Sequence, residues 1–460
     1  MFDKKFIEKY NISAPRYTSY PSVPYWDLSP TDKQWKKMVK SAILRCASPT
    51  KSTTSHQYIS IYIHLPYCES LCTYCGCNTR ITTNHNVEQP YINALLKEWS
   101  MYKKIFGSKP IIREIHLGGG TPTFFQPKNM ERLINGILKN AAVHPKHEFG
   151  FETSPNSVSE KHLISFYNMG FTRLSLGIQD FDQKVLRTIN RKQSYDLVKQ
   201  LTNRARQIGY TSINYDLLYG LPKQTFSGLK PTMQKVIKLQ PDRIAFYGYA
   251  HVPWIKHSQR KFTENDLPQG KNKFNLFELG KKLLTENGYN KIGIDHFALS
   301  GDSLSVSASN GNLNRNFMGY TSLSPKMLIG LGVSSISDIW NGFVQNAKTT
   351  EEYFSLLKKN KLPIIKGHIL TKEDKILRKH ILNLMCFFRT SWKKKSEQCD
   401  ALSEGVKRLQ EMNKDEMVFI RNDGLEITEK GKHFVRSICM AIDARIHRKV
   451  TTKQQHSTVV

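Results

Sequence analysis

Cysteines, acidic residues and long apolar runs are all scarce in this 460-residue sequence. Eight cysteines are too few to hold together a disulfide scaffold of this length. No apolar run approaches the roughly 20 residues that a membrane-spanning helix needs, and the N-terminus lacks the apolar stretch of a secretory signal. These absences argue against a secreted disulfide protein and against a helical membrane protein, so we expect a soluble protein of the cytoplasm.

The charge balance is strongly basic, because 38 Asp and Glu stand against 68 Lys and Arg, giving a formal net charge of +30. A basic protein can attract nucleic acid, an anionic surface or an acidic substrate. The excess is spread along the chain rather than gathered in a tail or arm. Charge by itself therefore selects no partner, and a solvated basic surface stays an alternative.

Between about residues 58 and 249, short strand-like runs alternate with helical ones. Helices are expected over 90–106 and 127–138, and glycines at 170 and 209 are placed to end two others. Strands that alternate with helices predict a parallel sheet with right-handed crossovers. The six expected strands are 58–64, 111–117, 148–152, 173–179, 212–218 and 243–247.

The positions of the special residues help to choose between two α/β architectures. Cysteines, glycines or polar residues stand at the carboxyl end of each of these strands. A barrel-like active site requires that arrangement, whereas a doubly wound sheet concentrates its ligand at one switch point. The sequence therefore predicts an open or incomplete (β/α)6 barrel with its extension over residues 56–365.

The two flanks of this region have different patterns. Residues 1–55 are rich in aromatics and proline and predict an extended or helical segment that covers the barrel, with a polar linker over 48–55. After about residue 366, expected helices over 371–387 and 400–413 are followed by a hairpin signal at Asn422-Asp423-Gly424. Residues 366–460 therefore predict a small, mostly helical, winged-helix-like domain.

Four of the eight cysteines lie within ten residues, at Cys68, Cys72, Cys75 and Cys77. Thiolates on one loop suit soft metals, either zinc or an iron–sulfur cluster. A structural zinc site usually takes two separated pairs of ligands, whereas three cysteines can hold three irons of a four-iron cluster and leave the fourth iron open. The spacing favours the cluster. The scattered cysteines are expected to be packing residues: Cys46, Cys386, Cys399 and Cys439.

A glycine run, Gly118-Gly119-Gly120-Thr121-Pro122, follows the second expected strand. It lacks the lysine of a phosphate-binding loop. Glycines let a backbone approach a ligand closely, so this run is a candidate for binding an amino-acid head group. The alternative is a tight turn.

The cysteine loop after the first strand and the glycine run after the second together resemble the radical S-adenosylmethionine (radical SAM) superfamily. Within it, nearly the whole chain is similar to the family of oxygen-independent coproporphyrinogen III oxidases. One departure is Met318, where this family typically has Gln, and another is the stretch 153–156. The segments that carry the likeness are 15–21 (Pro-Arg-Tyr-Thr-Ser-Tyr-Pro), 75–78, 177–181, 216–222, 249–251, 295–298 and 315–317.

The resemblance implies a [4Fe–4S] cluster and two molecules of S-adenosylmethionine per chain. Cys68, Cys72 and Cys75 would ligate the cluster, and Cys77 matches a family cysteine that is not a ligand. Local sequence alone also allows Glu152, Asp216 and Arg191 to be ordinary surface or turn residues. Positions matching contacts to the first S-adenosylmethionine are Tyr62, Gly119, Glu152 and Ile336, and those around the second are Tyr74, Gly120, Thr121, Gln179, Arg191, Asp216 and Ala250.

The implied activity is oxidative decarboxylation of two propionate side chains of coproporphyrinogen III to vinyl groups, through a 5′-deoxyadenosyl radical, in anaerobic haem synthesis. This substrate carries four carboxylates, so we expect Arg16 and Arg315 to contact it. We expect a monomer with an electron donor and an electron acceptor that the sequence does not identify, and no nucleic-acid partner. The alternatives are a haem-trafficking relative, another radical enzyme that modifies tetrapyrroles, and a nucleic-acid-modifying enzyme.

Overall fold

The computed structural model describes residues 3–47, 58–449 and 456–459. Six parallel strands form the middle of a twelve-stranded sheet, and they correspond to the six expected ones. The strand that contains 148–152 begins earlier than expected. Its first residues could not be predicted because they are mostly exposed and lack an apolar pattern. The six strands are β1 (Ile59–Leu65), β4 (Ile111–Gly119), β5 (Ala142–Thr153), β6 (Phe171–Gln179), β7 (Ser212–Tyr219) and β8 (Arg243–Gly248).

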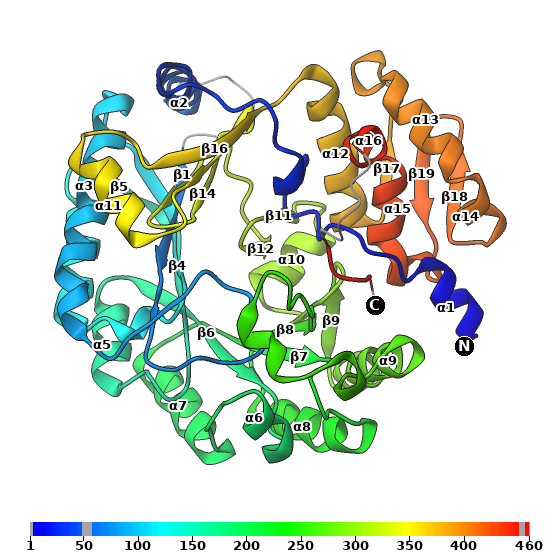
Figure 1. Cartoon of the computed structure of the whole chain (residues 1–460), viewed down its shortest axis with the longest axis horizontal. Helices are drawn as coiled ribbons and strands as arrows, with labels where there is room; N and C mark the ends of the chain where they lie inside the picture. The colour runs from blue at the N-terminus through cyan, green and yellow to red at the C-terminus, as the bar shows by residue number, and fades with distance from the viewer. Residues whose placement is uncertain (1–2, 48–57, 450–455, 460) are drawn as a thin grey trace.

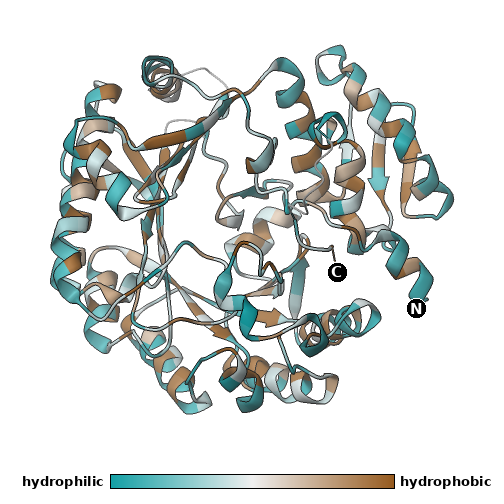
Figure 2. Ribbon diagram, viewed as in Figure 1, coloured by the Kyte–Doolittle hydropathy of each residue, from teal (hydrophilic) through white to brown (hydrophobic). Residues whose placement is uncertain are grey.

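Helices connect these strands and cover the outer face of the sheet, where α3, α5, α7 and α8 form an arc (Figure 1). Gly209 ends α7 in the left-handed conformation, and Gly170 has a positive φ just after α5, as expected of C-terminal glycines. The apolar faces of the helices pack on the sheet, and hydrophobic residues gather along this inner layer (Figure 2). The helices are α3 (Glu88–Phe106), α4 (Pro127–Leu138), α5 (Glu160–Asn168), α6 (Gln183–Thr188), α7 (Tyr195–Ile208) and α8 (Phe226–Leu239).

Six further strands extend the sheet beyond the expected core. On one side β13 pairs in parallel with β1, and β14, β15 and β16 follow antiparallel; on the other side β10 and β9 add an antiparallel edge. Within the described part of the chain the two edge strands, β16 and β9, do not pair, so the barrel is open. The added strands are β13 (Leu328–Leu331), β14 (Ile336–Asp338), β15 (Gly342–Asn346), β16 (Ile364–Ile369), β9 (Tyr289–Ile292) and β10 (His296–Leu299).

The C-terminal elements lie across from the helical arc (Figure 1). The expected hairpin is present as β18 (Val418–Arg421) and β19 (Gly424–Ile427), and β17 (Arg389–Ser391) adds a third strand that the sequence did not predict. The helix expected over 400–413 is divided into two. The helices are α12 (Lys372–Phe387), α13 (Asp400–Arg408), α14 (Gln410–Lys414), α15 (Val435–Ala441) and α16 (Ala444–Arg448).

The N-terminal segment runs between the sheet and these C-terminal helices (Figure 1). It contains α1 (Lys4–Tyr10) and α2 (Asp32–Ala47), and its aromatic residues Tyr17, Tyr20 and Trp26 are buried. Arg436 fastens it, since its Nε donates to the carbonyl of Pro15 at 3.0 Å. The linker expected over 48–55 lies outside the described residues.

Two smaller expectations concern cysteines and membrane spans. Cys386 and Cys439 are buried, as expected of packing residues, Cys399 is half-buried, and the side chain of Cys46 lies outside the described residues. Among the described residues, no helix combines the length and the apolar character that crossing a membrane requires.

Candidate active site

A cavity of about 510 Å³ lies at the carboxyl ends of the parallel strands. Loops after β1, β4, β5, β6 and β8 reach it, and β7 contributes residues of the strand itself, because the carboxyl ends of parallel strands share one edge of the sheet. The three cysteines predicted to be cluster ligands line it together with Cys77. The other predicted residues that line it are Arg16, Tyr74, Gly119, Gly120, Thr121, Glu152, Gln179, Arg191, Asp216 and Ala250.

The cysteine loop is held in place by side chains from distant loops. Lys256 Nζ donates to the carbonyl of Cys77 at 2.8 Å, and Gln259 Nε2 donates to the carbonyl of Tyr74 at 2.9 Å. From the segment after α6, Asn190 Nδ2 donates to the carbonyl that precedes Cys72 at 2.7 Å. The loop is therefore positioned before any metal binds.

The thiols meet donors and a cation at the cavity wall. Cys68 Sγ lies 3.4 Å from the hydroxyl of Thr121, and Cys72 Sγ lies 3.6 Å from Arg191 Nη1. Burial raises the pKa of Cys72, and the charge of Arg191 opposes that effect. A hydrogen bond from the Cys77 side chain lowers the pKa of Cys75. Burial also raises the pKa of Cys68 to about 11, so only Cys75 is held as a thiolate by these contacts, and metal binding would have to displace the protons of the other two thiols.

This donor set fits an iron–sulfur cluster. Three soft thiolates on one loop face a cavity large enough to admit a ligand at an open iron. In the described ranges, no three His, Cys, Asp or Glu side chains converge on the position of a single metal ion. A four-iron cluster does not need such convergence, since each cysteine would bind a different iron.

The glycine run packs closely on the start of the cysteine loop. A Cβ at Gly120 would lie 2.6 Å from the carbonyl oxygen of Pro66, and Gly119 has a φ of +117°. The amides of Gly120 and Thr121 donate to carbonyls of residues 65 and 67 at 2.8 and 3.0 Å. The glycines are therefore required for close contact between the two loops, and those two amides serve that contact.

Two carboxylates face the cavity from β5 and β7, which lie on either side of β6. An Oε1 of Glu152 lies 2.9 Å from His116 Nε2. Asp216 accepts hydrogen bonds from Ser175 Oγ and Asn214 Nδ2, each at 2.9 Å. Burial raises the pKa of Asp216 to about 7, and the charge of Glu152 adds to that shift. A wall of this kind suits a ligand that carries positive charge.

Three predicted residues are not part of the cavity wall. The ring of Tyr62 stacks on His116 with centroids 6.1 Å apart, and Ile336 packs against the cluster around Trp26. Arg315 is buried beneath the N-terminal segment, where its Nη2 donates to the carbonyl of Arg16 at 3.3 Å. Their predicted contacts with cofactor or substrate stay predictions.

Two arginines that the sequence did not single out also line the cavity. Arg173 and Arg243 line it from within β6 and β8, and they pair with Glu148 at 3.0 Å and Asp302 at 2.6 Å. Met318 lies in the same wall. The sequence feature that could have indicated these residues is an arginine in an otherwise apolar strand. A buried arginine costs free energy unless its side chain has a buried partner of opposite charge.

Comparisons with known proteins agree with this arrangement. Residues 62–236 match the family model described as the radical SAM superfamily. The chain is 35% identical to the oxygen-independent coproporphyrinogen III oxidase of Escherichia coli (strain K12), covering 100% of this chain and 98% of that protein. It is 33% identical to the protein of the same name from Helicobacter pylori (strain J99), covering 96% of each.

The fold comparison extends to a solved structure. Coproporphyrinogen III oxidase from Escherichia coli, described as a radical SAM enzyme, superimposes with a TM-score of 0.87 at 33% identity, covering 96% of this chain and 99% of that one. Full-length identity of this order, with the same fold and the cysteine loop at the cavity, decides the family. The chain belongs to the oxygen-independent coproporphyrinogen III oxidases of the radical SAM superfamily.

Proposed function

We propose that this protein converts two propionate side chains of coproporphyrinogen III to vinyl groups, giving protoporphyrinogen IX. Each conversion releases carbon dioxide and removes one hydrogen atom and one electron from the side chain. The observation that carries the proposal is the composition of the large cavity, which joins three cluster-type thiols, two carboxylates and the cation Arg16 in one space.

Cys68, Cys72 and Cys75 would hold the [4Fe–4S] cluster. When bound, the cluster and S-adenosylmethionine supply the radical that takes the hydrogen atom. The chain's own contribution is positioning: Lys256, Gln259 and Asn190 fix the cysteine loop from two sides. Cys77 would modulate Cys75 through their hydrogen bond rather than bind iron.

Two molecules of S-adenosylmethionine would lie side by side over the sheet. The strand order is β14, β13, β1, β4, β5, β6, β7, β8. The residues assigned to the first molecule lie on β14, β1, β4 and β5, whereas four of the seven assigned to the second lie on or after β6, β7 and β8, and the other three follow β1 and β4. This division supports two adjacent sites. The first set is Tyr62, Gly119, Glu152 and Ile336, and the second is Tyr74, Gly120, Thr121, Gln179, Arg191, Asp216 and Ala250.

The tetrapyrrole would occupy the part of the cavity next to Arg16, whose Nη2 donates to the carbonyl of Gly248 at the carboxyl end of β8. Its carboxylates suit Arg16, which lines the cavity, while Arg315 would hold Arg16 in place through its carbonyl. Residues 1–55 and 366–460 would act as covering units around the barrel unit 56–365, keeping water from the reacting carbon. The described parts of both units, 3–47 and 366–449, lie beside the sheet and support this role (Figure 1).

The test is anaerobic reconstitution with iron and sulfide, followed by reduction in the presence of S-adenosylmethionine and coproporphyrinogen III. We expect a product of the mass of protoporphyrinogen IX and two molecules of carbon dioxide for each substrate consumed. Methionine formed while the substrate stays intact would contradict the assignment. Haem binding without decarboxylation would favour the haem-trafficking alternative.

A further inference from the structure

An acid–imidazole pair, Asp295 and His296, lies at the start of β10, next to the last of the six parallel strands. His296 lines the large cavity, whereas the following residue, Phe297, is buried in the main hydrophobic core. Successive side chains of a strand point to opposite faces, so the imidazole is on the cavity side of the sheet. A substrate in the large cavity can therefore reach it.

Asp295 fixes one edge of the imidazole. Its Oδ1 lies 2.7 Å from Nδ1 of His296. Burial opposes the ionisation of Asp295, but the hydrogen bond with His296 and the charges of nearby arginines lower its pKa below the ordinary value. An ionised carboxylate can only accept a hydrogen bond, so Nδ1 carries the hydrogen and donates it. The other ring nitrogen, Nε2, is left for a different partner.

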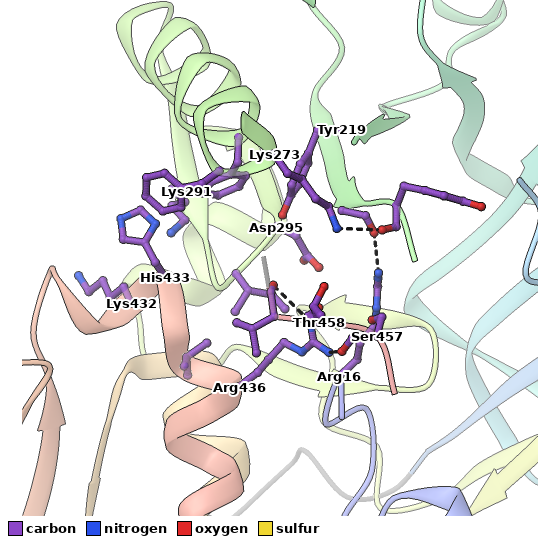
Figure 3. A pocket seen from close by; sticks show the side chains of 17 residues that line it. Arg16, Tyr219, Lys273, Lys291, Asp295, Lys432, His433, Arg436, Ser457 and Thr458 are labelled. Carbon is purple, nitrogen blue, oxygen red and sulfur yellow. Dashed lines mark hydrogen bonds between the residues drawn. The ribbon is translucent and has the colours of Figure 1, made fainter. Parts of the chain in front are cut away.

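Basic residues stand behind this pair. Asp295 lines a second cavity, of about 60 Å³, and Figure 3 shows it there among Arg16, Lys273 and Arg436. Arg16 also lines the large cavity, and its Nη2 donates to the carbonyl of Gly248 at 2.7 Å. The carboxylate of the pair thus faces the second cavity, while its imidazole faces the large one.

Two tyrosines hold the imidazole on its other sides. The rings of Tyr247 and Tyr320 each meet the ring of His296 edge to face, with centroids 5.5 and 5.2 Å apart. The hydroxyl of Tyr247 lies 3.4 Å from Nε2 of His296, and both tyrosines line the large cavity. This packing fixes the plane of the imidazole and keeps Nε2 and the Tyr247 hydroxyl together at the cavity wall.

Gly319 keeps the space beside these two atoms free. A Cβ at this position would lie 3.6 Å from Nε2 of His296 and 3.8 Å from Oη of Tyr247. A larger side chain would therefore begin in contact with both atoms and extend over them. The φ of +108° at Gly319 also disfavours any other residue there.

We propose that His296 and Tyr247 together bind one carboxylate of the tetrapyrrole. A protonated imidazole has two N–H donors, of which one serves Asp295 and the other is available to the substrate. The hydroxyl of Tyr247 adds a donor beside it, and charge-assisted hydrogen bonds to a carboxylate are among the stronger ones. This inference rests on the proposed function and adds a determinant of substrate orientation.

The bound carboxylate belongs to an arm that the reaction leaves intact. Decarboxylation removes negative charge from the carboxylate, and a hydrogen bond from an imidazolium stabilises that charge in the ground state. Such a donor on a reacting arm would raise the barrier to carbon dioxide loss. Two of the four propionates remain after the proposed conversion, and His296 suits one of these.

The test compares His296→Asn with His296→Gln in the cluster-loaded protein. The Asn amide can replace Nδ1 as the donor to Asp295 but does not reach the position of Nε2, whereas the Gln amide reaches that position. Anaerobic titration with coproporphyrin III should show about tenfold weaker binding for His296→Asn, and His296→Gln should recover part of the loss. His257→Asn, at an exposed position after β8, is the matched control and should bind as the wild type does.

A second ligand distinguishes a direct contact from a structural effect. The tetra-amide of coproporphyrin III has the same ring without carboxylates, so His296→Asn should leave its affinity unchanged. Tyr247→Phe keeps the aromatic ring and should weaken binding of the tetra-acid about threefold. This variant carries the test if His296→Asn does not fold. Protoporphyrin IX, which keeps two propionates, should lose affinity for His296→Asn as coproporphyrin III does.

Equal affinity of the wild type, His296→Asn and Tyr247→Phe for coproporphyrin III would overturn the inference, and so would an equal loss for the tetra-acid and the tetra-amide. A loss seen with coproporphyrin III and not with protoporphyrin IX would overturn the assignment to a retained arm. Failure of the proposed function would instead appear as a wild type that neither binds coproporphyrin III nor decarboxylates coproporphyrinogen III.

Discussion

The guanidinium of Arg191 lies 3.6 Å from the sulfur of Cys72, measured from Nη1 to Sγ. The same side chain also donates from Nη2 to Ser154 Oγ at 3.3 Å, so it is fixed by the loop after β5. A residue expected only to contact S-adenosylmethionine therefore also touches a predicted cluster ligand. This contact places a permanent positive charge beside the cluster position.

The first prediction concerns that charge. Arg191→Met should retain iron but shift the reduction potential of the cluster to more negative values by about 50 mV, roughly a tenfold change in the ratio of reduced to oxidised cluster. A nearby cation stabilises the additional electron, and its loss removes that effect. Redox titration followed by EPR measures the shift. Lys192→Met, at an exposed neighbouring position, is the matched control and should leave the potential unchanged.

The second prediction separates cluster ligands from Cys77. Cys68→Ala, Cys72→Ala and Cys75→Ala should each lose the cluster after reconstitution, because each removes one thiolate bond to iron. Cys77→Ala should keep it, since Cys77 is assigned a hydrogen bond to Cys75 and no iron. Iron and sulfide analysis with visible absorbance gives the readout. If Cys77→Ala were the one variant that lost iron, Cys77 would be a cluster ligand and the assignment of the other cysteines would be wrong.

The third prediction is a pH dependence of cofactor binding. Since burial raises the pKa of Asp216 to about 7, its carboxyl is mostly protonated at pH 6 and mostly ionised at pH 8. The ionised form attracts the sulfonium and ammonium groups of S-adenosylmethionine, so affinity should rise with pH through this range and level off above it. Anaerobic calorimetry at pH 6, 7 and 8 measures the change. Asp216→Asn should bind more weakly at pH 8 and lose most of the dependence; an unaltered profile would show that another group titrates.

The fourth prediction concerns stability at a site remote from the thiols. Glu98 is fully buried on α3, where Tyr353 Oη, Asn346 Nδ2 and the amide of Gly332 donate to it at 2.6, 2.7 and 2.9 Å. Burial raises its pKa to about 7, so the folded state prefers the protonated form more strongly than the unfolded chain does. The free energy of unfolding should therefore fall, by up to about 3 kcal/mol, as pH rises from 5 to 8.

Denaturant unfolding at several pH values measures this slope. Glu98→Gln cannot ionise and should flatten it, whereas Glu98→Ala leaves three buried donors unpaired and should cost about 2–4 kcal/mol at every pH. Lys97→Ala, the adjacent position on the same helix, is the control. A slope that persists in Glu98→Gln would assign the pH dependence to other groups.

Much of the barrel could be predicted because its signals are local. Alternating β-branched runs mark β1 and β4, and Gly209 marks the end of α7 through its positive φ. The short strands β13, β14 and β17 escaped prediction, since three or four residues carry too little pattern. The parallel partner of β13 is also remote, because it pairs with β1. The start of β5 escaped because it is exposed and not apolar.

The sequence by itself determined the chemistry available: a loop of closely spaced thiols, a glycine run beside it, and a succession of strands that bring polar ends to one edge. The tertiary structure alone decided which side chains share a space. It placed Arg191 against Cys72, buried Arg315 behind Arg16, and brought Lys273 to Arg16 and Arg436 around a second cavity. Those juxtapositions depend on packing between segments hundreds of residues apart, and neither periodicity nor spacing along a chain encodes such distances.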